Sequence, residues 1–202
     1  MRNALEIVSR ETLDRLDVFA ELVKKWNPKI NLISKASISE IWPRHIMDSA
    51  QVFDIANIDS GHWVDLGSGG GFPGIVVAII AKELAPGLRV SLVESDARKC
   101  AFLRTAIREF GIEASVFNER IEALEPLGAD ILTSRALADL TTLLMFAEMH
   151  LSTGGTALFH KGARWKEELG NAQSKWKFSS QAVKSTGDSN SAILKISGIS
   201  RV

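Results

Sequence analysis

The sequence predicts an α/β protein: a mostly parallel seven-stranded sheet with helices on both faces, an N-terminal helical extension and a C-terminal antiparallel hairpin. Three observations predict this fold. Apolar residues recur at helical spacing up to about residue 57, and short apolar strands then alternate with helices from residue 61 onwards. The last third holds two strand-like segments with no helix between them. Strands that alternate with helices in this way indicate a parallel sheet covered on both faces.

The N-terminal helical extension is expected to span residues 1–57 and to pack on a single compact unit formed by residues 58–202. Apolar residues recur every three or four positions from Leu13 to Trp26, and Asn27-Pro28 is expected to end that helix. A second helix is expected from about Ser39 to Ile55.

The remaining elements are read from apolar runs between turn residues. Strands are expected at 62–66, 89–94, 114–117, 130–134, 156–160, 177–183 and 192–196, and helices at 75–84, 97–110 and 140–151. The small and polar residues 185–190 are expected to join the last two strands into an antiparallel hairpin at the sheet edge.

Composition places the chain among soluble globular proteins. Lys plus Arg equals Asp plus Glu, at 24 each, so a nucleic-acid partner would have to bind a local patch. The single cysteine, Cys100, excludes an internal disulfide and argues against a cysteine-based metal cluster, so no metal is expected. The N-terminus lacks the apolar centre of a signal peptide, and no apolar run could span a bilayer. We therefore expect a cytoplasmic protein without a membrane partner.

A glycine-rich loop follows the first expected strand, from Asp65 to Gly74, with the sequence Asp-Leu-Gly-Ser-Gly-Gly-Gly-Phe-Pro-Gly. A strand, glycines and then a helix let a ligand approach backbone amides without meeting side chains. Such a loop serves any adenosine-containing cofactor. Gly69, Gly71 and Gly74 even satisfy the spacing of a dinucleotide fingerprint.

Three features favour S-adenosylmethionine over a dinucleotide. Asp65, Gly67 and Gly69 form the Asp-x-Gly-x-Gly pattern associated with methyltransferases. The carboxylate can orient the loop and hold the cofactor's amino-acid end, directly or through water, whereas it would repel a pyrophosphate. Glu94 ends the second strand, where it can accept hydrogen bonds from ribose hydroxyls in either cofactor. The C-terminal hairpin is typical of the Rossmann-like class I methyltransferases. A dehydrogenase, or a tight turn beside two surface carboxylates, remains the alternative.

Short blocks of residues, each present once, follow one another in a specific order along nearly the whole chain. They are Trp26–Leu32, Arg44–Ser49, the Gly-Phe-Pro-Gly end of the loop, Glu94-Ser95, Lys99–Leu103, Arg120–Glu122, Ser134–Ala136 and His160–Gly162. With these blocks the chain resembles the bacterial small-subunit ribosomal RNA methyltransferase G family, also called glucose-inhibited division protein B. The resemblance implies S-adenosylmethionine-dependent methylation of guanine N7 at one position in the 530-loop region of 16S ribosomal RNA.

The resemblance also implies cofactor contacts. They fall on Gly67, Phe72, Ile121, Glu122 and Arg135. Ile121 and Glu122 follow the third expected strand, where a methyltransferase usually meets the adenine, and Arg135 lies at the carboxyl end of the fourth. Without the resemblance, Glu122 could be a helix-start carboxylate and Arg135 a solvated loop residue.

Few catalytic residues are expected, because guanine N7 carries an in-plane lone pair at neutral pH and needs no general base. The enzyme must mainly align nitrogen, methyl carbon and sulfur and exclude water. The candidates to position the RNA are Arg44, His45, Asp48, Arg135 and Lys161. Arg44 and Lys161 suit phosphates or guanine O6, and Asp48 suits the guanine amino edge. His45 and Asp48 could instead pin the N-terminal helices to the core.

His160 is expected to face the other side of the sheet from Lys161, in a structural role. Basic clusters at residues 24–29, 98–108 and 161–166 are weak, so recognition should rest on shape and an extruded base. The expected partner is 16S ribosomal RNA in the small ribosomal subunit or an assembly intermediate, with no obligate protein partner. The alternatives are a methyltransferase acting on a small molecule, whose lid the N-terminal helices would form, and an adenosine-sensing binding module.

Overall fold

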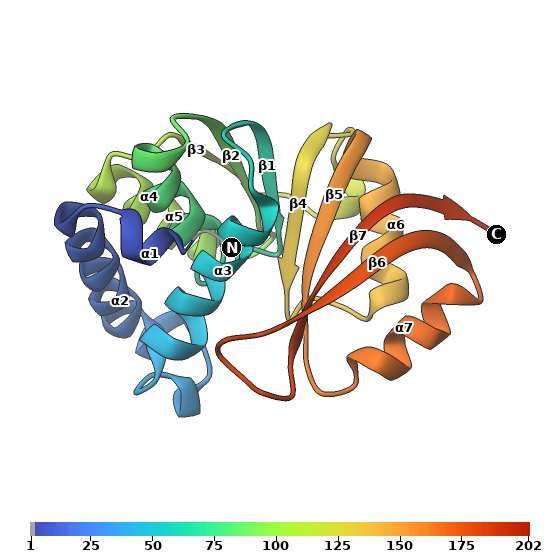
Figure 1. Ribbon diagram of the computed structural model, residues 1–202. Helices are drawn as coiled ribbons and strands as arrows, with labels where there is room; N and C mark the ends of the chain where they lie inside the picture. Colours follow the sequence, from blue (N-terminus) through green and yellow to red (C-terminus); the bar gives the residue numbers. More distant parts are fainter. Residues whose placement is uncertain (1–2) are drawn as a thin grey trace.

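The computed structural model describes residues 3–202, which form one twisted seven-stranded sheet with helices on both faces (Figure 1). The strand order is β3-β2-β1-β4-β5-β7-β6, in which β1 to β5 run parallel and β7 runs antiparallel to both β5 and β6. The strands are β1 (Ser60–Leu66), β2 (Gly87–Val93), β3 (Ala114–Phe117), β4 (Ala129–Arg135), β5 (Leu151–Lys161), β6 (Trp176–Lys184) and β7 (Ala192–Arg201). The predicted sheet and its C-terminal hairpin are therefore confirmed.

The N-terminal residues form a series of helices on one sheet face. These are α1 (Ala4–Ile7), α2 (Arg10–Ile30), a 3-10 helix η1 (Lys35–Ser37), a π-helix η2 (Trp42–Met47) and α3 (Asp48–Ala56). They pack with α4 (Gly74–Leu84) and α5 (Ala97–Phe110) around one apolar core. The Phe19 ring of α2 lies 5.2 Å from Phe72 and 6.3 Å from Phe102, between centroids. Because this core is shared, the division of the chain at about residue 57 stays a prediction.

The other sheet face is covered by α6 (Leu140–His150) and α7 (Trp165–Gln173), and a short 3-10 helix, η3 (Ile121–Ala123), follows β3. Helix α7 is not among the helices that the sequence pattern predicts. Of its nine residues only Ala172 is buried. An apolar stripe is the main sequence signal of a helix, and in α7 it is short: Trp165, Leu169 and Ala172 pack against the core, the first two only partly buried.

Helix α2 runs one turn past the end that Asn27-Pro28 predicts. Pro28 lies inside the helix, which ends at Ile30, and Asn31 then takes a left-handed conformation (φ 50°). Proline removes one hydrogen bond and crowds the preceding turn. The buried Asn27 side chain secures this end of the helix, since its Oδ1 accepts a hydrogen bond from the Ile33 amide at 2.8 Å.

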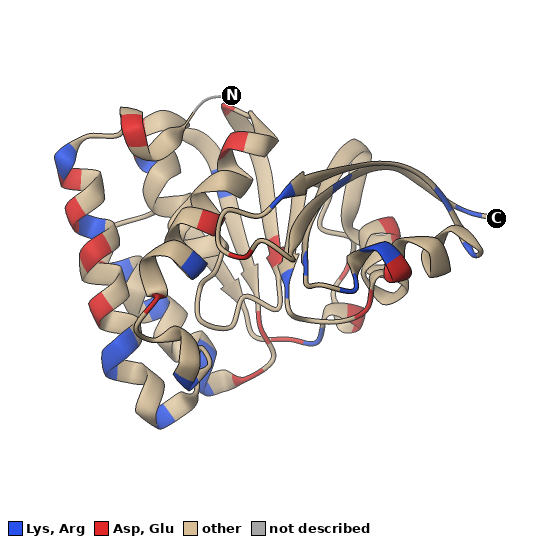
Figure 2. Ribbon diagram, turned by 60° about the horizontal axis from the view of Figure 1, so that its bottom comes forward, with Lys and Arg blue, Asp and Glu red and all other residues tan. Residues whose placement is uncertain are grey.

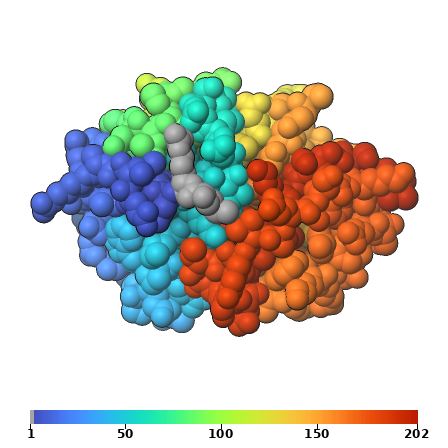
Figure 3. All heavy atoms as spheres, viewed as in Figure 1, coloured from blue at the N-terminus to red at the C-terminus, as the bar shows by residue number. Residues whose placement is uncertain are grey.

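The loop between β6 and β7 crosses to the N-terminal helices. Gln51 Nε2 donates to the Lys184 carbonyl at 2.8 Å, and the Thr186 amide donates to Gln51 Oε1 at 2.9 Å. A Cβ atom at Gly187 would lie 3.0 Å from the Pro43 carbonyl oxygen, so a larger residue would push the two backbones slightly apart. Figure 3 shows atoms of this hairpin (red) against atoms of the N-terminal helices (cyan).

Candidate functional site

The glycine loop connects the carboxyl end of β1 to α4. Gly67, Gly69 and Gly71 have φ values of +69°, +49° and +83°, a region that other residues seldom adopt. The amides of Gly67 and Ser68 both donate to the Val93 carbonyl, at 2.9 and 3.0 Å, which ties the loop to the end of β2. The loop therefore needs its glycines for conformation.

The Asp65 carboxylate lies buried beneath this loop. Its Oδ1 accepts from Thr133 Oγ1 at 2.8 Å, and its Oδ2 accepts from the Gly74 amide at 3.2 Å. Burial raises the pKa of Asp65 to about 6, and these hydrogen bonds only partly oppose that shift. The contacts support the loop-orienting role predicted for Asp65. Its contact with a cofactor stays a prediction, since Asp65 does not line the neighbouring cavities.

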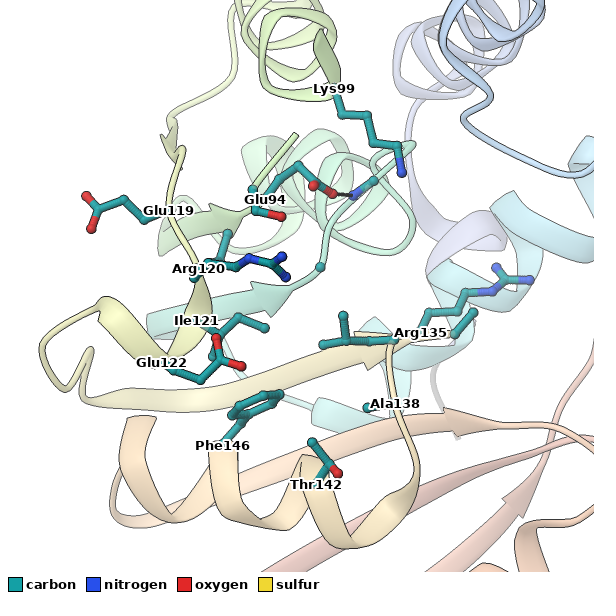
Figure 4. Close-up of a pocket in the computed structure, with 16 residues that line it drawn as sticks. Glu94, Lys99, Glu119, Arg120, Ile121, Glu122, Arg135, Ala138, Thr142 and Phe146 are labelled. Carbon is teal, nitrogen blue, oxygen red and sulfur yellow. Dashed lines mark hydrogen bonds between the residues drawn. The ribbon is translucent and has the colours of Figure 1, made fainter. Parts of the chain in front are cut away.

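A cavity of about 400 Å³ opens beside the loop at the carboxyl ends of the parallel strands (Figure 4). Side chains from the ends of β2 and β4, the segment after β3 and α6 surround it. Its lining includes the predicted cofactor residues Gly67, Gly69, Glu94, Ile121, Glu122 and Arg135. Phe72, also predicted, lines an adjoining cavity of about 360 Å³ that shares Gly67, Gly69 and Arg135 with the first. The structure thus brings together residues that lie up to 68 positions apart in the chain.

Glu94 presents two acceptor oxygens at the wall of the larger cavity. Its Oε2 accepts from the Gly69 amide at 3.0 Å, and its Oε1 accepts from the Asp96 amide at 2.8 Å. Each carboxylate oxygen can accept a second hydrogen bond. Ile121 and Phe146 give the same cavity apolar lining. Its volume falls within the roughly 300–1,000 Å³ of small-molecule sites, and its chemistry fits a ribose joined to a flat ring.

Arg135 ends β4 and reaches across to the N-terminal helices. Its Nη2 donates to the Arg44 carbonyl at 2.7 Å, and its Nη1 lies 3.7 Å from Asp48 Oδ2. The chain then turns at Ala136, whose φ is +52°. Arg135 and Ala136 line the two cavities above and a third of about 150 Å³, so all three cavities meet at this point.

Asp48 is 3% exposed and lies at the centre of a polar cluster beside the third cavity. Its Oδ1 accepts from Ser185 Oγ at 2.5 Å, and its Oδ2 lies 3.2 Å from His160 Nε2. Burial raises its pKa, but His160, Ser185 and Arg135 together outweigh burial and lower the pKa to about 2. Asp48 therefore remains ionised at neutral pH.

The sequence predicts that His160 faces the opposite side of the sheet from Lys161, in a structural role. The structure places His160 on that opposite face, where its side chain lies beside Asp48. Arg135 and His160 are register partners on β4 and β5, so their side chains emerge on the same sheet face. Sequence reasoning missed His160 as a site residue because it depends on strand register. Lys161 points to the other face, where its Nζ donates to the Ala138 carbonyl at 2.8 Å and lies 2.6 Å from Glu168 Oε2.

His45 packs against Phe72, with ring centroids 4.9 Å apart. Burial, together with the charges of Arg135 and Arg44, lowers the pKa of His45 to about 3, so the ring is neutral at pH 7. Buried side-chain nitrogens without a well-formed hydrogen bond occur, among residues 3–202, in His45, Arg135, His160 and His150. The first three surround Asp48. Of these nitrogens, His160 Nε2 and Arg135 Nη1 face the Asp48 carboxylate at 3.2 and 3.7 Å, which leaves the ring nitrogens of His45 and His160 Nδ1 as polar atoms that a ligand or water can meet.

Across residues 3–202, the structure contains no set of three His, Cys, Asp or Glu residues that could bind a metal ion. Nor does any helix in the described chain have the length and apolar character needed to cross a membrane.

Comparison with known proteins identifies the family. A family model described as rRNA small subunit methyltransferase G matches residues 12–195. The ribosomal RNA small subunit methyltransferase G of Ruegeria sp. strain TM1040 is 55% identical over 202 residues, which cover 100% of this chain and 98% of the relative. Its counterpart in Ruegeria pomeroyi is 59% identical over 196 residues, 96% of this chain and 95% of the relative.

Among solved structures, a SAM-dependent methyltransferase from Aquifex aeolicus matches with a TM-score of 0.61 at 10% identity, covering 88% of this chain and 97% of that one. The class I methyltransferase fold predicted from the sequence is thereby confirmed. The resemblance carried by the short residue blocks is confirmed as well. The chain belongs to the rRNA small subunit methyltransferase G family.

Proposed function

We propose that this protein transfers a methyl group from S-adenosylmethionine to N7 of a guanine at one position in the 530-loop region of 16S ribosomal RNA. Family membership makes the chain an S-adenosylmethionine-dependent methyltransferase of small-subunit ribosomal RNA. The guanine, its N7 atom and its position are our proposal. The observation that carries it is the meeting of three cavities at Arg135, with an unsatisfied polar cluster beside the cavity that fits an adenosine.

The residues around the larger cavity fit the cofactor. Glu94 would accept hydrogen bonds from the ribose hydroxyls, and Ile121 and Phe146 would lie against the adenine with Glu122 at its edge. Gly67 and Gly69 leave room for the amino-acid end along the loop. When bound, S-adenosylmethionine supplies a methyl group that its sulfonium makes electrophilic.

The smallest cavity suits the target base, because its lining combines acceptors with donors. Asp48 and Asp188 supply acceptors, and Arg44 and Arg135 supply donors. Guanine offers the matching set: N–H donors at N1 and N2, and acceptors at O6 and N7. Adenine has an acceptor at N1, which would face a carboxylate unfavourably. We therefore assign Arg44 and Asp48 to positioning of the guanine, together with His45, which lines the adjoining cavity with Phe72.

No residue has to act as a general base in this proposal. The task of the protein is to hold the guanine in line and to exclude water. His45 contributes by being neutral, because a protonated imidazole beside a sulfonium would repel it. The negative charge of the Asp48 carboxylate and the positive charge of the Arg135 guanidinium, 3.7 Å apart, offset each other in the same region.

The surface supports recognition by shape. In the ribbon of Figure 2, positions with Lys or Arg alternate with positions with Asp or Glu along most elements, and the net charge is zero. We propose that 16S ribosomal RNA in the small ribosomal subunit, or in an assembly intermediate, presents the base already extruded. This would take place in the cytoplasm without an obligate protein partner.

The test is to incubate the protein with S-adenosylmethionine carrying a labelled methyl group. One arm holds small subunits from a strain that lacks the modification, and the other holds a total metabolite extract. We expect label in 7-methylguanosine from the subunit arm only. Label that appears only in the metabolite arm would establish the small-molecule alternative instead.

A further inference from the structure

The loop between β4 and α6, residues 135–139, forms one wall of the cofactor cavity. Ala136, Leu137 and Ala138 line it, and Leu137 covers the glycine loop so closely that a Cβ at Gly67 would lie 2.8 Å from Leu137 Cδ1. Yet Leu137 is 39% exposed, and Ala136 takes a left-handed conformation. Apolar packing reaches this loop at Ala138, but Ala136 and Leu137 are exposed, so polar anchors help to fix the position of the loop.

The anchors lie at both ends of the loop. At the start, the Arg135 side chain donates to the Arg44 carbonyl. At the far end, Lys161 Nζ donates to the Ala138 carbonyl at 2.8 Å, and the Leu140 amide donates to Glu168 Oε2, also at 2.8 Å. Leu140 is the first residue of α6, so its amide has no partner within the helix.

One carboxylate oxygen joins the two far-end anchors, because Glu168 Oε2 also lies 2.6 Å from Lys161 Nζ. The Lys161 side chain is 7% exposed and the Glu168 side chain 23%. In such an environment an ion pair is less screened by water, and losing one partner leaves a buried charge. Glu168 itself lines none of the three cavities.

We infer that Glu168 of α7 is a positioning residue for the cofactor. Acting through Lys161 and the Leu140 amide, it fixes the wall formed by Ala136, Leu137 and Ala138 against the glycine loop. The inference rests on the proposed placement of S-adenosylmethionine in this cavity. It also gives Lys161, which lines the smallest cavity, an indirect role at the cofactor cavity in addition to the predicted contact with RNA.

The first test compares Glu168→Gln with Glu167→Gln, a matched change at the preceding, exposed residue of α7. We expect the dissociation constant for S-adenosylmethionine, measured by calorimetry, to rise about tenfold in E168Q, as for the loss of a charged hydrogen bond. E167Q should bind like the wild type. Amide hydrogen exchange of residues 136–140 should be faster in E168Q than in E167Q.

A second variant addresses folding, since E168Q leaves the Lys161 ammonium buried without its carboxylate. The double variant Lys161→Met with Glu168→Gln removes both charges. We expect its Tm to lie closer to that of the wild type than E168Q does, while binding of S-adenosylmethionine stays weak. Wild-type affinity in either variant, or affinity that recovers together with the Tm, would overturn the inference. If the wild-type protein binds S-adenosylmethionine but puts no label into 7-methylguanosine, that result would count against the proposed function and not against this inference.

Discussion

At the scale of single residues, neighbouring groups shift the pKa values of two buried carboxylates, Asp65 and Asp48, in opposite directions, although burial alone raises both. Asp65 accepts only hydrogen bonds from neutral groups, and burial raises its pKa to about 6. Asp48 lies beside Arg135 and His160, and its pKa is lowered to about 2. The difference matches their places: Asp65 orients a loop from beneath, while Asp48 lines a cavity with charged neighbours.

The raised pKa of Asp65 predicts a pH-dependent stability. The folded protein binds the Asp65 proton more tightly than the unfolded chain does. Protonation of Asp65 therefore contributes fully to the free energy of unfolding below about pH 4. It is lost as the pH rises through about 6, a change of about 3 kcal/mol. Asp65→Asn cannot titrate. Urea unfolding between pH 4 and 7 should show the wild type losing stability relative to this variant. Parallel pH profiles of unfolding free energy for the wild type and Asp65→Asn would contradict the prediction. Asp14→Asn, at an exposed position, is the control and should follow the wild-type profile.

At the scale of elements, the sequence predicts those features that depend on the spacing of neighbouring residues. The strands, the glycine loop and the strand-end residue Glu94 follow from apolar periodicity and turn residues, and the structure has them. Helix α7 is absent from the predicted helices because it has only nine residues and its apolar stripe is just Trp165, Leu169 and Ala172. His160 was missed as a site residue because its neighbours depend on the register of β4 and β5, which includes an irregularity between Ala129 and Ile131.

Because the β6–β7 loop packs on η2, a change in this loop should affect turnover without affecting cofactor binding. In Gly187→Val the added side chain would meet the backbone of Pro43 and Arg44 and displace the wall of the smallest cavity. We expect kcat on ribosomal subunits to fall while the affinity for S-adenosylmethionine changes less than about twofold, since the loop does not line the larger cavity.

Gly170→Ala is the control for this change, because a Cβ there meets no atom within 4 Å. It should leave kcat intact and add up to about 1 kcal/mol of stability through helix propensity. Equal losses of cofactor affinity and turnover in Gly187→Val would show that the loop supports the whole fold instead of the target site.

At the scale of the whole molecule, the N-terminal helices and the β6–β7 loop meet across the carboxyl ends of the parallel strands. The N-terminal helices contribute Arg44, His45 and Asp48, and the C-terminal hairpin contributes Ser185. No spacing in the sequence predicts this contact, since Ser185 and Asp48 are 137 positions apart. Resemblance of short blocks named these N-terminal residues as candidates. The fold shows why they could act together with Arg135.

The most direct test of the central claim locates the methyl group itself. Unmodified small subunits are treated with the protein and S-adenosylmethionine, and fragments of 16S ribosomal RNA are then sequenced by mass spectrometry. We predict one added methyl group, on N7 of a single guanine in the 530-loop region. A methyl group on another atom of the base, on a ribose or in another region of the RNA would contradict the account.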